Sequence, residues 1–98
     1  MKLIVGAAAL VLAGCGTSAA GSTLRWQNNA QYPTIEIERA ARVGDECQTW
    51  RPLVTIPGNE STLLALEREA VPPCYRLRGC TTTDCSAFSE PRWKGASH

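Results

Sequence analysis

The sequence is short and nearly neutral, with 98 residues, ten lysines and arginines, nine acidic residues and a formal net charge of +1. A chain of this length has room for one small domain at most. The balanced charge argues against a nucleic-acid partner, which would require a basic surface. The chain also has no polybasic segment to hold an anionic lipid surface. Any attachment to a membrane would therefore have to be covalent.

The first residues have the order of a secretory leader. Lys2 supplies a positive end, the run from Leu3 to Leu12 is apolar, and small residues follow. An apolar run this short cannot cross about 30 Å of hydrocarbon as a helix. A charged start followed by a short apolar run and small residues is typical of a cleaved signal peptide. We therefore expect residues 1–14 to be a signal peptide.

The segment Leu12–Cys15, with the sequence LAGC, resembles the lipobox of bacterial lipoproteins. The resemblance implies cleavage before Cys15, which would carry a covalent diacylglycerol and an acyl chain; we expect no other cofactor. Several acyl chains anchor a protein firmly, because each buried methylene contributes about 0.8 kcal/mol. Gly16 is not the aspartate that signals inner-membrane retention in this family, so the resemblance implies a lipid anchor in the outer membrane, facing the periplasm or the cell surface. The alternative is a secreted protein cut near residues 19–20.

The residues after the lipobox have the composition of a tether. Residues 16–22 contain only glycine, serine, threonine and alanine, which cannot bury apolar surface. We expect a lipidated cysteine and flexible tether over residues 15–22, a folded domain over 23–95 and a short tail over 96–98. At about 3.3 Å per residue, the seven tether residues reach at most roughly 23 Å. The domain would therefore lie close to the bilayer.

From Leu24 onward the apolar residues recur at every second position, which predicts strands with one buried face. The alternating apolar pairs are Leu24 and Trp26, Ile35 and Ile37, and Tyr75 and Leu77. Turn-forming residues separate these runs, and short strands at this spacing favour a sandwich or small barrel. Residues 61–70 also contain strong helix formers, but a helix of this length is marginal without a packed face. We predict a strand there because its neighbours are strand-like.

The order of these elements resembles a fibronectin type III domain. The residues that carry the resemblance are Leu24 to Trp26 for the second strand, Ile35 to Arg39 for strand C, Trp50 to Ile56 for C′, Leu66 and Tyr75 to Arg78 for the approach to strand F and the strand itself, and Cys80 to Pro91 for the F–G hairpin. The resemblance implies an all-β, fibronectin type III-like (immunoglobulin-like) sandwich. Almost nothing remains for a first strand, which would be short or missing and would leave an open sheet edge.

Four cysteines remain when Cys15 is set aside: Cys47, Cys74, Cys80 and Cys85. An even number in a small secreted domain predicts two disulfides, with three possible connectivities. The fibronectin type III resemblance implies the pairs Cys47–Cys74 and Cys80–Cys85. The spacing does not form the paired knuckles of structural zinc sites, so we expect no metal.

The sequence contains no convincing catalytic arrangement. Its only histidine is His98, the last residue, which cannot be held as a general base. Glu36 and Glu38 would lie about 7 Å apart on one strand face, a separation that glycosidases use. The fibronectin type III resemblance places them opposite Arg78 and Arg76 on an open face, so we expect a charge ladder and no enzyme.

Three aromatic residues are the binding candidates: Trp50, Trp93 and Tyr32. Exposed aromatic side chains are enriched where proteins bind their partners, whereas Trp26 is expected in the core. We expect a non-catalytic module that binds a protein or a polymer at the cell envelope, with another envelope or assembly protein as partner. Two alternatives stay open: a structural part of a phage virion, lysis complex or secretion apparatus, and a lipoprotein inhibitor of an envelope hydrolase.

Overall fold

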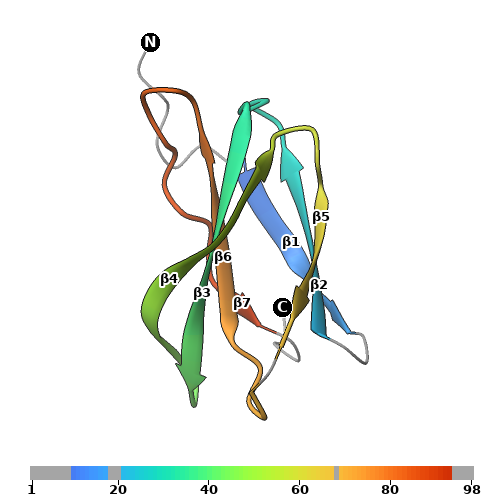
Figure 1. Ribbon diagram of the computed structural model, residues 1–98, viewed down its shortest axis with the longest axis vertical. Coiled ribbons are helices and arrows are strands. Elements are labelled where there is room, and N and C mark those ends of the chain that lie inside the picture. The colour runs from blue at the N-terminus through green and yellow to red at the C-terminus, as the bar shows by residue number, and fades with distance from the viewer. Residues whose placement is uncertain (1–9, 18–20, 68, 94–98) are drawn as a thin grey trace.

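The computed structural model describes residues 10–17, 21–67 and 69–93 of the chain, and these residues form two antiparallel sheets (Figure 1). One sheet has the order β1-β2-β5 and the other the order β4-β3-β6-β7. The strands are β1 (Leu10–Thr17), β2 (Gly21–Asn28), β3 (Thr34–Val43), β4 (Glu46–Pro57), β5 (Thr62–Leu66), β6 (Cys74–Cys80) and β7 (Arg92–Trp93). The described residues include no helix long and apolar enough to cross a membrane.

The core lies between the two sheets and consists of the alternating apolar residues that the sequence predicts. Strand β2 contributes Leu24 and Trp26, and the strands β3 and β6 of the other sheet contribute Ile35, Ile37, Tyr75 and Leu77. All are buried. Trp26 also donates a hydrogen bond from Nε1 to the backbone oxygen of Glu60 at 3.0 Å, so its one polar atom is satisfied. The predicted all-β architecture is confirmed.

The ambiguous segment at residues 61–70 contributes a strand, as predicted. Strand β5 pairs with β2 along its whole length, from Gly21 opposite Leu66 to Arg25 opposite Thr62. Only Ala65 of this strand is buried, while Leu64 and Leu66 are exposed. A two-residue period explains this pattern, because alternate side chains of an edge strand point away from the core.

The structure differs from the sequence expectation at the first strand, which is neither short nor missing. Strand β1 has eight residues and pairs with β2 from Leu10 opposite Asn28 to Thr17 opposite Ser22. The physical reason is that β2 would otherwise expose a row of unpaired N–H and C=O groups. Residues 10–17 were assigned to the leader and tether, so cleavage before Cys15, which stays a prediction, would remove part of this strand.

The folded domain also begins earlier than predicted. Gly21 and Ser22 belong to β2 and are buried, and the Ser22 hydroxyl donates a hydrogen bond to the Glu67 carboxylate. A buried hydroxyl needs such a partner. The expected tether over 15–22 therefore has strand residues at both of its ends, in β1 and in β2. Residues 1–9, 18–20 and 94–98 lie outside the described residues, and with them much of the predicted signal peptide and tether and all of the tail.

Both expected disulfides are present. Cys47 near the start of β4 is bonded to Cys74 at the start of β6, and Cys80 at the end of β6 is bonded to Cys85. The first bond ties the turn between β3 and β4 to the neighbouring strand. The second closes the turn that follows β6, at the opposite end of that strand.

The chain after Cys85 runs back along β6, so the hairpin expected over Cys80 to Pro91 is present but has an irregular second arm. Strand β7 has two residues, which pair with the start of β6. Between them, Ser86 and Ser89 each hold one residue of β6 by two hydrogen bonds. Their backbone N–H groups donate to the oxygens of Gly79 and Leu77, each at 2.8 Å, and their hydroxyls accept from the N–H groups of the same two residues, each at 3.1 Å. Serine side chains therefore take the place of a regular strand ladder here.

Candidate functional site

The outer face of β6 carries a stack of arginine and aromatic side chains. The Arg76 guanidinium lies 4.2 Å from the centre of the Trp50 ring and 4.0 Å from that of Phe88, while Arg78 lies 4.5 Å from Phe88. Such cation–π contacts each contribute about 0.5–2 kcal/mol. Arg76 therefore joins β4, β6 and the segment before β7 through a single side chain.

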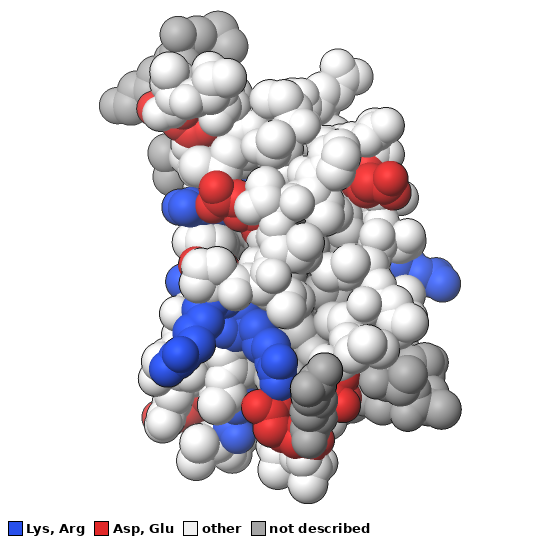
Figure 2. Space-filling model, viewed as in Figure 1, with Lys and Arg blue, Asp and Glu red and all other residues white. Residues whose placement is uncertain are grey.

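The predicted charge ladder occupies the same face. Glu36 pairs with Arg78 at 2.7 Å and Glu38 pairs with Arg76 at 2.6 Å, in the register that places each pair directly opposite across β3 and β6. Both carboxylates are therefore engaged with cations. Basic and acidic side chains are also interspersed over the face in Figure 2, where the largest basic group lies directly beside an acidic one. No broad patch of one sign covers that face.

A bulge in β4 turns Trp50 onto this outer face. Arg39 lies opposite Arg51 and Ala41 lies opposite Gln48, so Thr49 and Trp50 together face a single residue of β3. Thr49 has a φ of 63°, a left-handed conformation that is unusual for a β-branched residue. Bulges of this kind redirect side chains and are common beside functional sites. The orientation of Trp50 thus depends on a strained residue directly before it.

Trp93 is positioned by β7 and by an arginine of β3. Its backbone pairs with Cys74, and Arg42 lies over its ring at 5.4 Å from the ring centre. Arg42 is itself held, because it donates hydrogen bonds to the backbone oxygens of Gly44 at 2.9 Å and Pro72 at 3.3 Å. The turn between β3 and β4 and the end of β7 are therefore fixed to each other.

Trp50 and Trp93, two of the three predicted binding residues, line one hollow of about 650 Å³. The other residues that line it are Asp45, Cys47, Glu90, Pro91 and Arg92. Its volume lies within the range of small-molecule sites and exceeds that of two other hollows, of about 420 and 370 Å³. The hollow lies at the end of the molecule where β3 turns into β4 and where β7 pairs with β6 (Figure 1).

The polar groups around this hollow are of mixed type. Asp45 and Glu90 are exposed carboxylates, which accept hydrogen bonds, and Arg92 is a half-buried guanidinium, which donates them. The Nε atom of Arg92 is buried and finds no acceptor among the described residues. A buried donor without an acceptor costs free energy. Sequence reasoning missed these three residues, since single charged residues on a surface are ordinary and nothing in their spacing joins them.

The third predicted binding residue, Tyr32, is buried and lines the separate hollow of about 370 Å³. Only 5% of its surface is exposed, and its ring lies against Gly79, where an added Cβ would collide with it. The loop around it is held by Asn28, whose side chain accepts from the Tyr32 N–H and donates to its carbonyl oxygen. The Tyr32 side chain is therefore part of the core and does not join Trp50 and Trp93 at their hollow.

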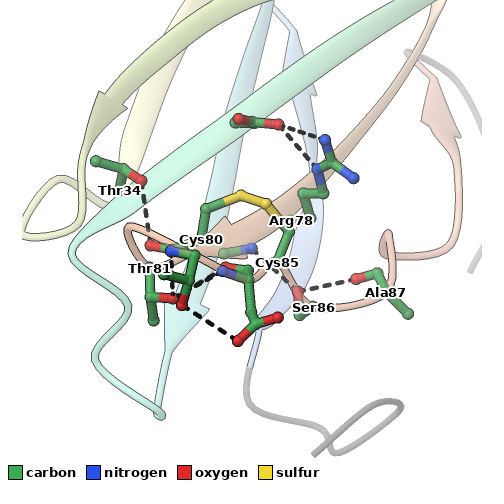
Figure 3. Close-up of a disulfide and its surroundings, with 11 residues drawn as sticks. Thr34, Arg78, Cys80, Thr81, Cys85, Ser86 and Ala87 are labelled. Carbon is green, nitrogen blue, oxygen red and sulfur yellow. Dashed lines mark hydrogen bonds and ion pairs between the residues drawn. A yellow bond between two sulfur atoms is a disulfide. The ribbon is translucent and has the colours of Figure 1, made fainter. Parts of the chain in front are cut away.

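The side chains of Glu36, Cys80 and Cys85 come together near the end of β6. Figure 3 shows the sulfur atoms joined to each other beside Arg78, with Thr34 donating to the Cys80 carbonyl oxygen at 3.1 Å. Metals bind the thiolate form of cysteine, which a disulfide removes. The Cys80–Cys85 disulfide therefore has a structural role, because it closes the turn after β6. His98 lies outside the described residues, so its proposed lack of a catalytic role stays a prediction.

In comparisons with known proteins, no family model and no curated protein sequence matches this chain. Its function is therefore argued from the hollow and from the sequence patterns.

Proposed function

We propose that this protein is a lipid-anchored, non-catalytic binding module of the cell envelope, which binds its partner at the hollow lined by Trp50 and Trp93. One observation carries the proposal: two half-buried indole rings, far apart in the sequence, line a single hollow with charged side chains at its rim. Aromatic side chains with a few placed polar groups are the usual composition of binding sites. No cofactor beyond the acyl groups on Cys15 is invoked.

The order of the strands supports the resemblance to fibronectin type III domains on which part of this proposal rests. That resemblance assigns Leu24 to Trp26 to the second strand and Ile35 to Arg39 and Tyr75 to Arg78 to neighbouring strands C and F. The first segment lies in β2, and the other two lie in the neighbouring strands β3 and β6, an arrangement that is compatible with this assignment. Folds of this kind present binding surfaces at loops and sheet ends, although the fold alone does not define a ligand.

The position of the hollow supports an envelope location for its ligand. Strand β2 starts at Gly21, at the same end of the molecule as the turn between β3 and β4 and as β7 (Figure 1). A chain anchored at Cys15 has at most about 20 Å of backbone before it reaches Gly21. The hollow would then face material within a short distance of the bilayer, in the outer membrane or the adjacent wall.

The anchor is tested by the intact mass of protein extracted from membranes in detergent, with Cys15→Ser as the comparison. We expect a chain that starts at Cys15 and carries a diacylglyceryl and an acyl group. The Cys15→Ser variant should lack both groups and keep its leader, because in lipoproteins cleavage follows lipid attachment. A lipid-free mass that begins beyond Cys15 would contradict the anchor.

The binding role is tested by a photoreactive amino acid placed at Glu90, at the rim of the hollow. Illumination of intact cells should attach envelope material to the protein at this position. Thr83 is the matched control, because it is equally exposed but lies in the turn after Cys80, at the opposite end of β6. Labelling from neither position, or equal labelling from both, would contradict a binding site at the hollow.

A second candidate function is a structural role in a larger assembly. Leu64 and Leu66 are 50% and 58% exposed on β5, an edge strand of its sheet. An edge strand with exposed apolar side chains can pair with another chain. Light scattering of the detergent-extracted protein measures the mass of the particle and separates the two functions. A multimer of fixed size that dissociates in the Leu66→Lys variant would favour the structural role.

A further inference from the structure

We propose that the hollow lined by Trp50 and Trp93 binds an uncharged saccharide, namely a segment of the glycan strands of the cell wall. This inference rests on the proposed function, because it names the ligand class of the same site. The neutral sugars of a wall glycan present apolar ring faces and acetyl methyl groups together with hydroxyl and amide groups. Three features point to this ligand class: the two indole rings, the mixed charges at the rim, and the contacts that hold the site rigid before a ligand binds.

The aromatic rings provide the apolar part of the match. Trp50 and Trp93 are each half-buried, and both line the hollow. The flat C–H face of a sugar ring packs on an aromatic face in the way that other apolar groups do, with dispersion contacts over its whole area. Two rings along one hollow can contact successive sugar units of a chain.

The rim charges favour a neutral ligand over an ion. Asp45 and Glu90 would oppose an anion such as a phosphate. Arg92 lines the same hollow and Arg42 lies on Trp93 at 5.4 Å, so both would oppose a cation. A saccharide meets both kinds of group, because each hydroxyl can donate to a carboxylate and accept from a guanidinium.

The site is also held in place before any ligand arrives. The Cys47–Cys74 disulfide lies in its wall, and the hydrogen bonds from Arg42 fix the turn that carries Asp45. Arg76 holds Trp50 by its stacking contact at 4.2 Å. Weak saccharide contacts give useful affinity only when little ordering accompanies binding, and this preorganisation fits that requirement.

The test is co-sedimentation of the full-length protein, solubilised in detergent, with insoluble purified peptidoglycan. We expect the wild-type protein to sediment with peptidoglycan and Trp50→Ala and Trp93→Ala to bind about tenfold more weakly, as for central binding residues. Asp45→Asn and Glu90→Gln should each weaken binding about threefold, the effect of one altered hydrogen bond. Soluble oligosaccharides of N-acetylated amino sugars should compete.

Matched controls separate loss of the site from loss of the fold. Asp84→Asn and Glu60→Gln make the same chemical changes at exposed positions away from the hollow and should leave sedimentation unchanged. Each variant should retain both disulfides by intact mass after alkylation. Arg76→Lys gives a second readout, because it keeps the charge but weakens the flat stacking that positions Trp50; it should bind more weakly than wild type.

Three results would overturn the inference: no sedimentation of the wild-type protein, equal losses in the hollow and control variants, or displacement by choline or inorganic phosphate instead of the oligosaccharide. Binding to lipopolysaccharide micelles is measured in parallel. Preferential binding to this anionic glycolipid would contradict a neutral ligand. Photo-labelling from position 90 distinguishes failure of the saccharide proposal from failure of the binding-module proposal. A protein adduct there, without peptidoglycan binding, refutes the saccharide and keeps the binding module; no adduct refutes both.

Discussion

At the scale of single residues, Thr49 combines an unfavourable backbone conformation with a position next to a candidate ligand-binding tryptophan. Its φ of 63° costs on the order of 1–3 kcal/mol for such a residue. Thr49→Gly should therefore raise the free energy of unfolding in urea by about 1 kcal/mol, after the entropy cost of glycine. Thr55→Gly, at an exposed position of β4 without a positive φ, should instead lower it by about 1 kcal/mol. A loss of stability in both variants would contradict strain at Thr49.

The same residue explains how far the site could be predicted from the sequence. Trp50 and Trp93 were proposed as binding candidates from residue type alone, and the structure places both of them at one hollow. Their meeting in one hollow depends on the bulge at Thr49, which no period-two pattern encodes. Tyr32 was indistinguishable from them by type, and its burial is set by contact with Gly79, a residue far along the chain. The sequence therefore identified aromatic candidates by their type, but it could not show which of them lie together in the folded domain.

At the scale of the strands, Arg76 of β6 connects three other segments on the outer face. It stacks between Trp50 and Phe88 and pairs with Glu38. We expect Arg76→Ala to lower the free energy of unfolding by about 2 kcal/mol, since two cation–π contacts and a partly exposed ion pair are lost. Glu38→Gln, which affects the ion pair alone, should cost less than about 1 kcal/mol.

Urea denaturation of these variants tests that connection. Arg25→Ala is the matched control, because Arg25 is exposed on β2, and its removal should change stability by less than about 0.5 kcal/mol. Equal effects of Arg76→Ala and Glu38→Gln would mean that the aromatic stack contributes nothing and that the ladder alone holds this face.

The strands themselves were largely predictable, apart from the first strand and the last hairpin. Alternating apolar residues identified the buried faces of β2, β3 and β6, and the family resemblance gave the register of the charge ladder. The irregular second arm of the last hairpin was not predictable, because the Ser86 and Ser89 hydroxyls accept hydrogen bonds from β6 that a regular strand would accept at its backbone oxygens. Serine in such a segment looks like an ordinary loop residue, so the pattern contains no signal for this pairing.

At the scale of the whole molecule, the two disulfides close loops of very different length, with sequence separations of 27 and five residues. Loss of the longer loop closure, in Cys47→Ala/Cys74→Ala, should lower the free energy of unfolding by about 3–4 kcal/mol, against about 2 kcal/mol for Cys80→Ala/Cys85→Ala. Chemical denaturation of the two double variants gives the comparison. A larger loss from the short loop would show that its hydrogen bonds, and not chain entropy, dominate.

The first strand is where the structure departs most from the sequence expectation, because its residues were expected in the leader and the tether. The apolar run at residues 3–12 has the properties of a leader, yet its last residues pair with β2 in the full-length chain. Both readings follow from the same feature, because an apolar extended segment suits a secretory leader and also suits a sheet edge. The sequence could not predict the pairing, since it depends on whether residues 10–14 are still present when the sheet forms.

Cleavage before Cys15 should therefore change the exposure of one edge of β2, and hydrogen exchange measures this directly. The Trp26 N–H donates to Ser61 on the β5 side at 3.1 Å, so the N–H groups of Arg25 and Gln27 point the other way, towards β1. In a chain that starts at Cys15, both lose their partners, because these lie within the removed residues 10–14. Their amides should exchange at least about tenfold faster than in the full-length chain, while the Trp26 amide, the internal control, should be unchanged. Equal protection of Gln27 in both chains would mean that another segment covers this edge after cleavage.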